Sequence, residues 1–259
     1  MEIKDRAKDG IRDGIRAGIK ITYIYHSCFC VELEHSILVF DYYKGELPPW
    51  NPEKQIYFFA SHAHGDHFHL KVFDWLDRYP LAKFVLSSDI RLSDTYLERH
   101  GVPGSVRERI ITARKNSSFI LDEMKIETLK STDEGVAFVI EAEGTKLYHA
   151  GDLNWWHWEG ETPEYNVQMQ KDYCREIDRL KGRSFDAVFL PLDPRLEGSF
   201  GWGMDYFLKQ TVPAHIFPMH MWDDYDVIRR YMETETGKQW KDRIIQVEES
   251  ADGYSEWNI

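Results

Sequence analysis

The sequence predicts an α+β protein in which two strand-rich halves form a β-sandwich with helices on its outer faces. Short runs rich in Ile, Val, Tyr and Phe occur in two series, over residues 19–60 and 108–150, and helical patterns follow each series. No Pro- or Ser-rich linker separates the halves, so we expect one domain. Clusters of His and Asp come directly after several of these strands, which places them at one edge of the sandwich.

The first half contains five expected strands, at 19–25, 28–34, 36–40, 55–60 and 83–87. Apolar residues at helical spacing predict a helix from Leu70 that ends at Pro80. A polar helix is expected over 88–100, because Gly101 stands where helices commonly end.

The second half contains a further series of expected strands at 108–113, 117–121, 124–129, 136–142 and 145–150. After it the pattern predicts helices over 165–181, from the glycine-rich loop 198–203 to about 210, and over 223–236. Strands are expected at 186–190, 214–218 and 243–248.

Residues 1–18 differ from the rest of the chain. Residues 9–20 repeat a pattern of the type Asp-Gly-Ile-Arg nearly three times, and a glycine at every fourth position weakens a helix. We therefore expect an N-terminal extension over 1–18 and a single domain over 19–259.

The composition disfavours some classes of function. The formal net charge is −12, which disfavours nucleic-acid binding, since that binding depends on Lys and Arg at the phosphates. Three cysteines do not make a disulfide framework. We find no apolar run long enough to span a membrane and no signal-peptide pattern, so a cytoplasmic protein is expected. A homo-oligomer is compatible with the sequence.

The chemistry is concentrated in residues 61–67, Ser-His-Ala-His-Gly-Asp-His, which follow a buried apolar strand. His62 and His64 are two positions apart and can project the same way, whereas Asp66 and His67 are adjacent and must diverge. Gly65 allows the backbone to turn between the two pairs. This divergence suits two neighbouring metal ions better than one.

Imidazole and carboxylate without thiolate favour an open catalytic zinc site, or manganese or iron, over a closed structural zinc. The predicted cofactors are therefore two divalent metal ions, with Zn²⁺ as the first choice.

His-x-His-x-Asp-His after an apolar strand resembles the metallo-β-lactamase superfamily, and the resemblance extends over most of the chain from Ile19. Residues 148–152, Tyr-His-Ala-Gly-Asp, and 217–220, Phe-Pro-Met-His, are similar to later motifs of that family. Residues 25–29 and 39–41 are similar to the opening strands of the branch that contains ascorbate-6-phosphate lactonase. The resemblance implies a four-layer αβ/βα sandwich, with two mixed β-sheets flanked by helices.

The resemblance also implies roles for individual residues. One metal would lie on His62 and His64 and a second on Asp66, His67 and His220, with Asp152 between them. In the lactonase branch the equivalents of His26 and Asp41 lie near the metals. In this motif His149 is expected to orient its loop rather than to bind metal.

One feature departs from the family. The loop 129–135, Leu-Lys-Ser-Thr-Asp-Glu-Gly, lacks the histidine that usually completes the first metal site. Either that metal is weakly held or absent, or Asp133 or His157 replaces the ligand. His157 could equally contact substrate or pack against aromatic residues.

Two further groups of residues lie near these motifs. Trp155 and its neighbours in Trp-Trp-His-Trp, residues 155–158, either line a substrate pocket or belong to the core. Arg195, which follows another strand, either meets an anionic substrate or forms a surface ion pair.

Together these features predict a hydrolase that uses metal-bound hydroxide to cleave a small ester or lactone, phosphorylated or not. Asp66 would orient the hydroxide and carry its proton to the leaving group. The alternatives are a phosphodiesterase or nuclease of the same fold, which the net charge disfavours, and a non-catalytic metal-binding protein. Di-iron redox chemistry is a third alternative, but it normally needs a flavin-bearing partner domain.

Overall fold

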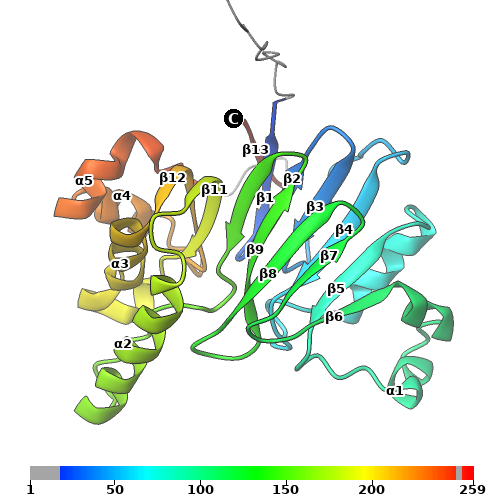
Figure 1. Cartoon of the computed structure of the whole chain (residues 1–259), viewed down its shortest axis with the longest axis horizontal. Helices are drawn as coiled ribbons and strands as arrows, with labels where there is room; N and C mark the ends of the chain where they lie inside the picture. Colours follow the sequence, from blue (N-terminus) through cyan, green and yellow to red (C-terminus); the bar gives the residue numbers. More distant parts are fainter. Residues whose placement is uncertain (1–17, 249–252) are drawn as a thin grey trace, which may run out of the picture.

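The computed structural model describes residues 18–248 and 253–259, which fold into two mixed β-sheets packed face to face with helices outside them (Figure 1). This arrangement confirms the predicted fold class. The predicted extension, residues 1–18, lies outside the described residues except for Gly18.

The first sheet has seven strands in the order β13-β1-β2-β3-β4-β5-β6. The pairs β3–β4, β4–β5 and β5–β6 are parallel, and the pairs on the other side of β3 are antiparallel. Its strands are β1 (Lys20–Tyr25), β2 (Cys28–Glu32), β3 (Ser36–Phe40), β4 (Gln55–Ala60), β5 (Lys83–Ser87), β6 (Ile110–Ala113) and β13 (Ser255–Asn258).

The second sheet has six strands in the order β12-β11-β10-β9-β8-β7. Strands β10, β11 and β12 are parallel to one another, whereas β7, β8, β9 and β10 form an antiparallel meander. Its strands are β7 (Ser118–Leu121), β8 (Met124–Lys130), β9 (Val136–Ala142), β10 (Thr145–His149), β11 (Ser184–Pro191) and β12 (Val212–Met219).

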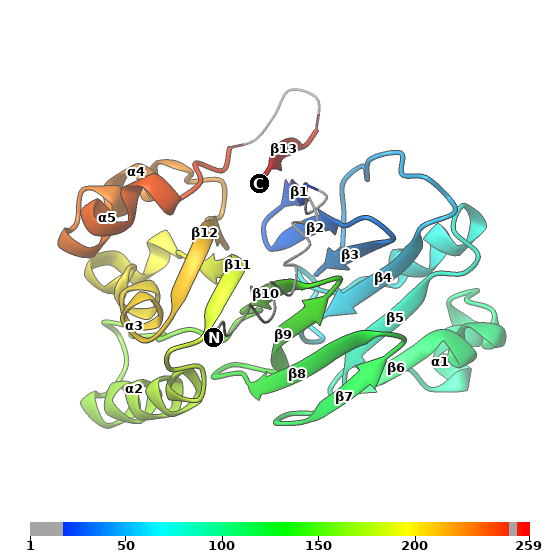
Figure 2. The ribbon, with the colours of Figure 1, turned by 45° about the horizontal axis from the view of Figure 1, so that its top comes forward.

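The helices cover the outer faces of both sheets. In Figures 1 and 2, α2 to α5 lie beside β11 and β12, and α1 lies beyond β5 and β6. The α-helices are α1 (Asp94–Arg99), α2 (Pro163–Asp178), α3 (Trp202–Gln210), α4 (Asp226–Met232) and α5 (Glu235–Trp240). The 3₁₀ helices are η1 (Leu70–Asp77), η2 (Gly104–Arg109), η3 (Pro194–Ser199) and η4 (Lys241–Arg243).

Alternation along the strands of the first sheet divides their apolar residues between two cores. In β3, Leu38 and Phe40 face the core between the sheets, whereas Ile37 and Val39 face the core under the outer helices of the first sheet. Rings meet across the two sheets, as in the pair Phe59–Phe138, whose centroids are 5.2 Å apart. Both faces of β3 are therefore buried, which explains its continuous apolar sequence.

The structure corrects four of the expected elements. The helix expected from Leu70 is the 3₁₀ helix η1, which ends at Asp77, and the helix expected over 88–100 begins only after Ser93, whose side chain accepts a hydrogen bond from the Tyr96 N–H. The helix expected over 223–236 is two helices, because Thr234 caps a new one.

The fourth correction concerns the last strand. Residues 243–248 form no strand; Ile244 makes only an isolated bridge to Ile216, and Ile244 and Val247 are buried in the hydrophobic core. The last strand is instead β13, which pairs with β1 in the first sheet.

Several strands end at the same edge of the sandwich. The carboxyl ends of β3, β4, β10, β11 and β12 lead into Asp41, His62, Asp152, Asp193 and His220 respectively. The polar residues that follow strands of the first and of the second sheet therefore lie together at one site. In the described residues, no helix has both the length and the apolar character needed to cross a membrane.

Candidate metal centre

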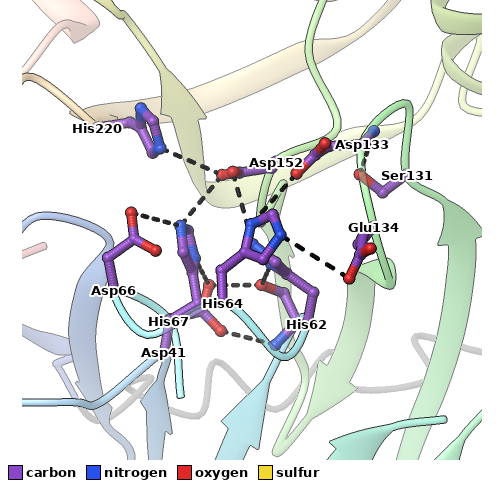
Figure 3. Close-up of polar contacts among 12 residues, drawn as sticks. Asp41, His62, His64, Asp66, His67, Ser131, Asp133, Glu134, Asp152 and His220 are labelled. Atoms are coloured by element: carbon purple, nitrogen blue, oxygen red, sulfur yellow. Dashed lines mark hydrogen bonds and ion pairs between the residues drawn. The ribbon is translucent and has the colours of Figure 1, made fainter. Parts of the chain in front are cut away.

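The histidine-rich loop after β4 is held by hydrogen bonds to two aspartates outside it. The Ser61 N–H donates to Asp41 Oδ1 at 2.7 Å, and the Ala63 N–H donates to Asp89 Oδ2 at 2.8 Å. The N–H of His67 donates to the carbonyl of His64 at 3.0 Å, which closes the turn. The loop is therefore fixed by backbone contacts, and its side chains point toward one another in Figure 3.

Asp41 orients two histidines at once. Its Oδ2 accepts from Nδ1 of His67 at 2.8 Å and from the hydroxyl of Ser61 at 2.7 Å. Since the Ser61 proton goes to Asp41, its oxygen accepts from Nδ1 of His62 at 3.0 Å. This network places a proton on each Nδ1 and leaves the Nε2 atoms of His62 and His67 as lone-pair donors.

Asp152 lies between the two halves of the cluster. Its Oδ2 is 3.6 Å from Nε2 of His62, while Oδ1 is 3.3 Å from Nε2 of His67 and 3.5 Å from Nε2 of His220 (Figure 3). Gly151 makes this position reachable, because its φ is +51° and an added Cβ would lie 2.5 Å from Cβ of Ser61.

His220 has its own carboxylate partner. Nδ1 of His220 donates to Oδ2 of Asp193 at 3.0 Å, which again leaves Nε2 toward the centre. His220, His26 and Asp41 have φ values of 65°, 55° and 47°. A positive φ is costly for such residues, and backbone strain of this kind concentrates at functional sites.

The acidic loop after β8 reaches the exposed side of the cluster. Oδ2 of Asp133 is 3.5 Å from Nδ1 of His64, and both side chains are partly exposed. The loop is tightly packed here: Gly135 has a φ of +68°, and an added Cβ would lie 1.9 Å from the Ser61 carbonyl. Oε2 of Glu134 is 3.8 Å from the other nitrogen of His64.

The side chains form two groups whose donor atoms all lie within 4.8 Å of one another in each group. Either group could hold a metal ion. The first consists of His62, His64, Asp133 and Asp152, and the second of His26, Asp66, His67 and His220.

Buried nitrogen and oxygen atoms without a hydrogen-bond partner indicate whether the cluster suits a metal ion. Nε2 of His26, His62 and His67 and Oδ1 of Asp152 are buried without a hydrogen-bond partner. Buried polar atoms are normally paired, because an unpaired one costs about 1–3 kcal/mol. Four such atoms lie at the centre of one cluster, where bound metal ions would pair with them, so the residues fit a metal centre.

Charge is unusually dense here. Burial alone would raise the pKa of Asp152, but His67 and His220 outweigh burial and hold that pKa well below its usual range. Burial alone would lower the pKa of His220, yet the carboxylates of Asp152 and Asp193 raise it to about 10. For His62, burial is the largest effect and lowers its pKa. The carboxylates are thus ionised and bring negative charge that a cation would neutralise.

Two of the residues expected near the metals support the cluster from outside. Asp41 is buried and bonds to His67. His149 donates from Nε2 to the carbonyl of Ser27 at 3.0 Å and accepts from the Gly151 N–H at Nδ1 at 3.2 Å. Because both ring nitrogens are used, His149 has no lone pair free for a metal.

Two other candidates lie away from the cluster. Trp155 lines a separate cavity near α3 and packs on Trp202 at 5.4 Å between centroids. His157 also packs against Trp202, at 4.6 Å. Among the residues that the structure describes, His157 belongs to neither possible metal group. The loop after Asp152 brings both side chains against Trp202, and aromatic packing is one of the three roles expected of His157.

A cavity of about 260 Å³ opens over the cluster. Trp156 and Trp158, whose rings are 6.1 Å apart and nearly parallel, form one side of it. Nε1 of Trp156 donates to the carbonyl of Asp152 at 2.9 Å, which ties the wall to the metal centre. The other lining residues beyond the cluster are Thr132, Tyr165, Met169, Arg195 and Trp222.

Sequence reasoning missed three supporting residues, Ser61, Asp89 and Asp193. The sequence could have indicated Asp193, because it comes shortly after the end of β11 just as Asp152 comes shortly after the end of β10. The roles of Ser61 and Asp89 depend on contacts between β4 and its neighbours and have no comparable signal in the sequence.

Comparisons with known proteins agree with this geometry. A family model described as a beta-lactamase superfamily domain matches residues 20–156. No curated protein matches the chain.

Solved structures with a similar fold include Igni18, a metallo hydrolase from Ignicoccus hospitalis. It is 18% identical over 94% of this chain and 100% of its own, with a TM-score of 0.56. CmlA, a diiron β-hydroxylase from Streptomyces venezuelae, is 9% identical with a TM-score of 0.58; the match covers 94% of this chain but only 54% of CmlA.

These likenesses support the fold, and the family model covers more than half of the chain. The chain therefore belongs to the beta-lactamase superfamily, with a metallo-β-lactamase fold and a cluster of His and Asp residues that could bind metal.

Proposed function

We propose that this protein is a metal-dependent hydrolase that holds two divalent metal ions and cleaves a small ester or lactone. The observation that carries the proposal is the position of Asp152, whose two carboxylate oxygens face different histidines at the centre of the cluster. A carboxylate so placed can join two metal ions.

The first metal would lie on His62, His64 and Asp133, and the second on Asp66, His67 and His220, with Asp152 shared. Asp133 takes the place of the absent family histidine, since its carboxylate joins the first possible metal group. His26 lies within reach of the second metal, and its unpaired Nε2 makes it a further candidate ligand.

When bound, the two metals would supply Lewis acidity and would lower the pKa of a coordinated water. The protein's own residues would do the rest. The Nδ1 protons held by Asp41 and Asp193 keep His67 and His220 in the tautomer that ligates through Nε2. Asp66, whose side chain reaches the cavity, would take up a proton at its carboxylate and pass it to the leaving group.

The cavity limits the substrate. About 260 Å³ is small beside typical ligand pockets of about 300–1,000 Å³ and suits a small ester or lactone rather than a polymer. The resemblance to the branch of ascorbate-6-phosphate lactonase points to the same class, and a phosphorylated member of that class is included.

The choice of metal follows from the donors. Both groups combine imidazole with carboxylate, which suits Zn²⁺ and, because of the oxygen donors, also Mn²⁺ or iron. We place Zn²⁺ first, with the first site the more weakly held because His64 and Asp133 are partly exposed.

A substrate panel tests the proposal. Purified protein loaded with Zn²⁺ or Mn²⁺ is assayed with lactones, carboxylic esters and phosphodiesters, beside His62→Ala and Asp152→Ala variants of verified fold. Hydrolysis of an ester or lactone that both variants lose supports the proposal. Equal activity of the variants and the native protein in every reaction found contradicts it.

A further inference from the structure

The cavity above the metal centre contains one Lys or Arg side chain among its described lining residues, that of Arg195. It lies in η3, directly after the strand that ends at Pro191. About half of the side chain is exposed, at 48%, so it is accessible from the cavity.

The guanidinium is held in place by a buried carboxylate and two indole rings. Nε of Arg195 donates to both oxygens of Asp193 at 3.0 Å, and Nη2 donates to Oδ2 at 2.6 Å. The guanidinium carbon is 4.4 Å from the centroid of Trp222 and 5.6 Å from that of Trp158. These contacts lower the entropic cost of forming further bonds to this group.

One edge of the guanidinium is left free. Asp193 occupies the Nε–Nη2 edge, and Nη1 makes no hydrogen bond within the described residues. The remaining Nη1–Nη2 edge is a planar fork with the geometry that pairs with two oxygens of a carboxylate or phosphate.

The rest of the cavity would direct an anion to this edge. Its other charged side chains are the carboxylates of Asp66, Asp133 and Asp152, and its walls are largely aromatic. When bound metal ions neutralise those carboxylates, Arg195 would be the one cation among the described lining residues that is not part of the reacting centre. Within that lining, an acidic substituent of the substrate would then have Arg195 as its matching partner.

We propose that the free Nη1–Nη2 edge of Arg195, between Trp158 and Trp222, binds an anionic group of the substrate, either a carboxylate or a phosphate monoester. The inference rests on the proposed hydrolysis and names its substrate class: small anionic esters or lactones. Arg195 is thus a residue that determines specificity, and the ion pair with Asp193 serves to hold it.

Binding of anions at Arg195 is tested with ligands that the protein cannot hydrolyse as esters. Phenylacetate, benzylphosphonate and the neutral 2-phenylacetamide are titrated into native and chelator-treated protein while tryptophan fluorescence is followed, because Trp158 and Trp222 flank the site. We expect one of the anions to bind at least tenfold more tightly than the amide. Arg195→Met should remove that preference, and Arg195→Lys, which keeps the charge but not the fork, should restore part of it.

Arg183→Met is the matched control, because Arg183 is similarly exposed at 40% and pairs with a carboxylate at 2.7 Å, but lies at the start of β11 outside this cavity. It should bind all three probes as the native protein does. Tighter binding of phenylacetate would indicate that the site takes a carboxylate, and tighter binding of benzylphosphonate would indicate a phosphate. Equal affinity of the native and Arg195→Met proteins for the anions overturns the inference.

Kinetics separates this inference from the proposed function. With a neutral ester and its carboxylate-bearing analogue as substrates, Arg195→Met should raise KM at least tenfold for the anionic ester alone, with kcat and metal content unchanged. If kcat and metal content instead fall for both substrates, Arg195 acts only through Asp193 and His220, and the inference is wrong. Absence of all hydrolysis together with Arg195-dependent binding refutes the proposed function but keeps the anion site.

Discussion

Replacing Asp41 by asparagine should weaken metal binding although Asp41 belongs to neither possible metal group of the described residues. The carboxylate accepts the proton of His67 Nδ1 at 2.8 Å and, through the Ser61 hydroxyl, supports His62. An asparagine amide that faces His67 donates instead of accepting. The imidazole then moves its proton to Nε2, the atom that would bind the metal.

The size of the effect follows from the two histidines involved. Loss of one such outer partner typically lowers metal affinity about 10- to 100-fold, which is about 1.4–2.7 kcal/mol. Because Asp41 supports a candidate ligand of each metal, we expect a loss near the upper end, about 100-fold, in the Asp41→Asn variant.

Competition with a chromogenic chelator measures the dissociation constants, and long-range ¹H–¹⁵N spectra of the histidines report the tautomer of His67. Asp122→Asn is the control, since Asp122 also accepts bonds from two side chains, Tyr57 and Lys83, but is 46% exposed and belongs to neither possible metal group of the described residues. Unchanged affinity in Asp41→Asn, with the proton still on Nδ1 of His67, would refute the reasoning.

Three further predictions concern the surroundings of the metals. Asp133→Ala should reduce metal content by one equivalent per chain and Asp133→His should restore it, as atomic emission analysis would reveal; full occupancy in Asp133→Ala would exclude Asp133 as a ligand. Gly135→Ala should lower the free energy of unfolding more than Gly101→Ala, measured by urea denaturation. Both glycines have a positive φ, which costs about 1–3 kcal/mol for other residues, but only at Gly135 would a Cβ meet another atom. Trp158→Ala should raise KM for an active ester while Trp155→Ala leaves it unchanged, because only Trp158 lines the cavity over the metals; the reverse order would contradict this placement.

The fold was largely predictable because its strands carry local signals. Strand β4 is a continuous apolar run, and its bounds match the expected 55–60. By contrast, β13, with the sequence Ser-Glu-Trp-Asn, has no apolar alternation and forms because β1 offers an open edge. Segment 243–248 contains Ile244, Ile245 and Val247 and has the composition of a strand, but it makes only an isolated bridge to Ile216 of β12. Pairing with a distant edge is a tertiary effect that a local pattern does not contain.

The site residues likewise fall into those that the sequence alone brings together and those that only the fold brings together. His62, His64, Asp66 and His67 stand within six positions, so their proximity follows from the sequence alone. The choice between Asp133 and His157 needed the fold. The loop of Asp133 packs over the end of β4, whereas the loop after Asp152 turns His157 outward against Trp202. Which strand ends lie side by side determines that Asp133 lies in a possible metal group, whereas His157 lies in neither group of the described residues.

The number of metal ions bound per chain tests the central claim most directly. Metal-free protein is titrated with Zn²⁺ in a calorimeter, and the metal content of the product is measured independently, with Asp152→Ala in parallel. We predict two equivalents for the native protein and the loss of tight binding at both sites in Asp152→Ala, because its carboxylate is shared. A folded native protein that binds no metal, or an Asp152→Ala variant that binds two ions as tightly as the native protein, would contradict a centre built around Asp152.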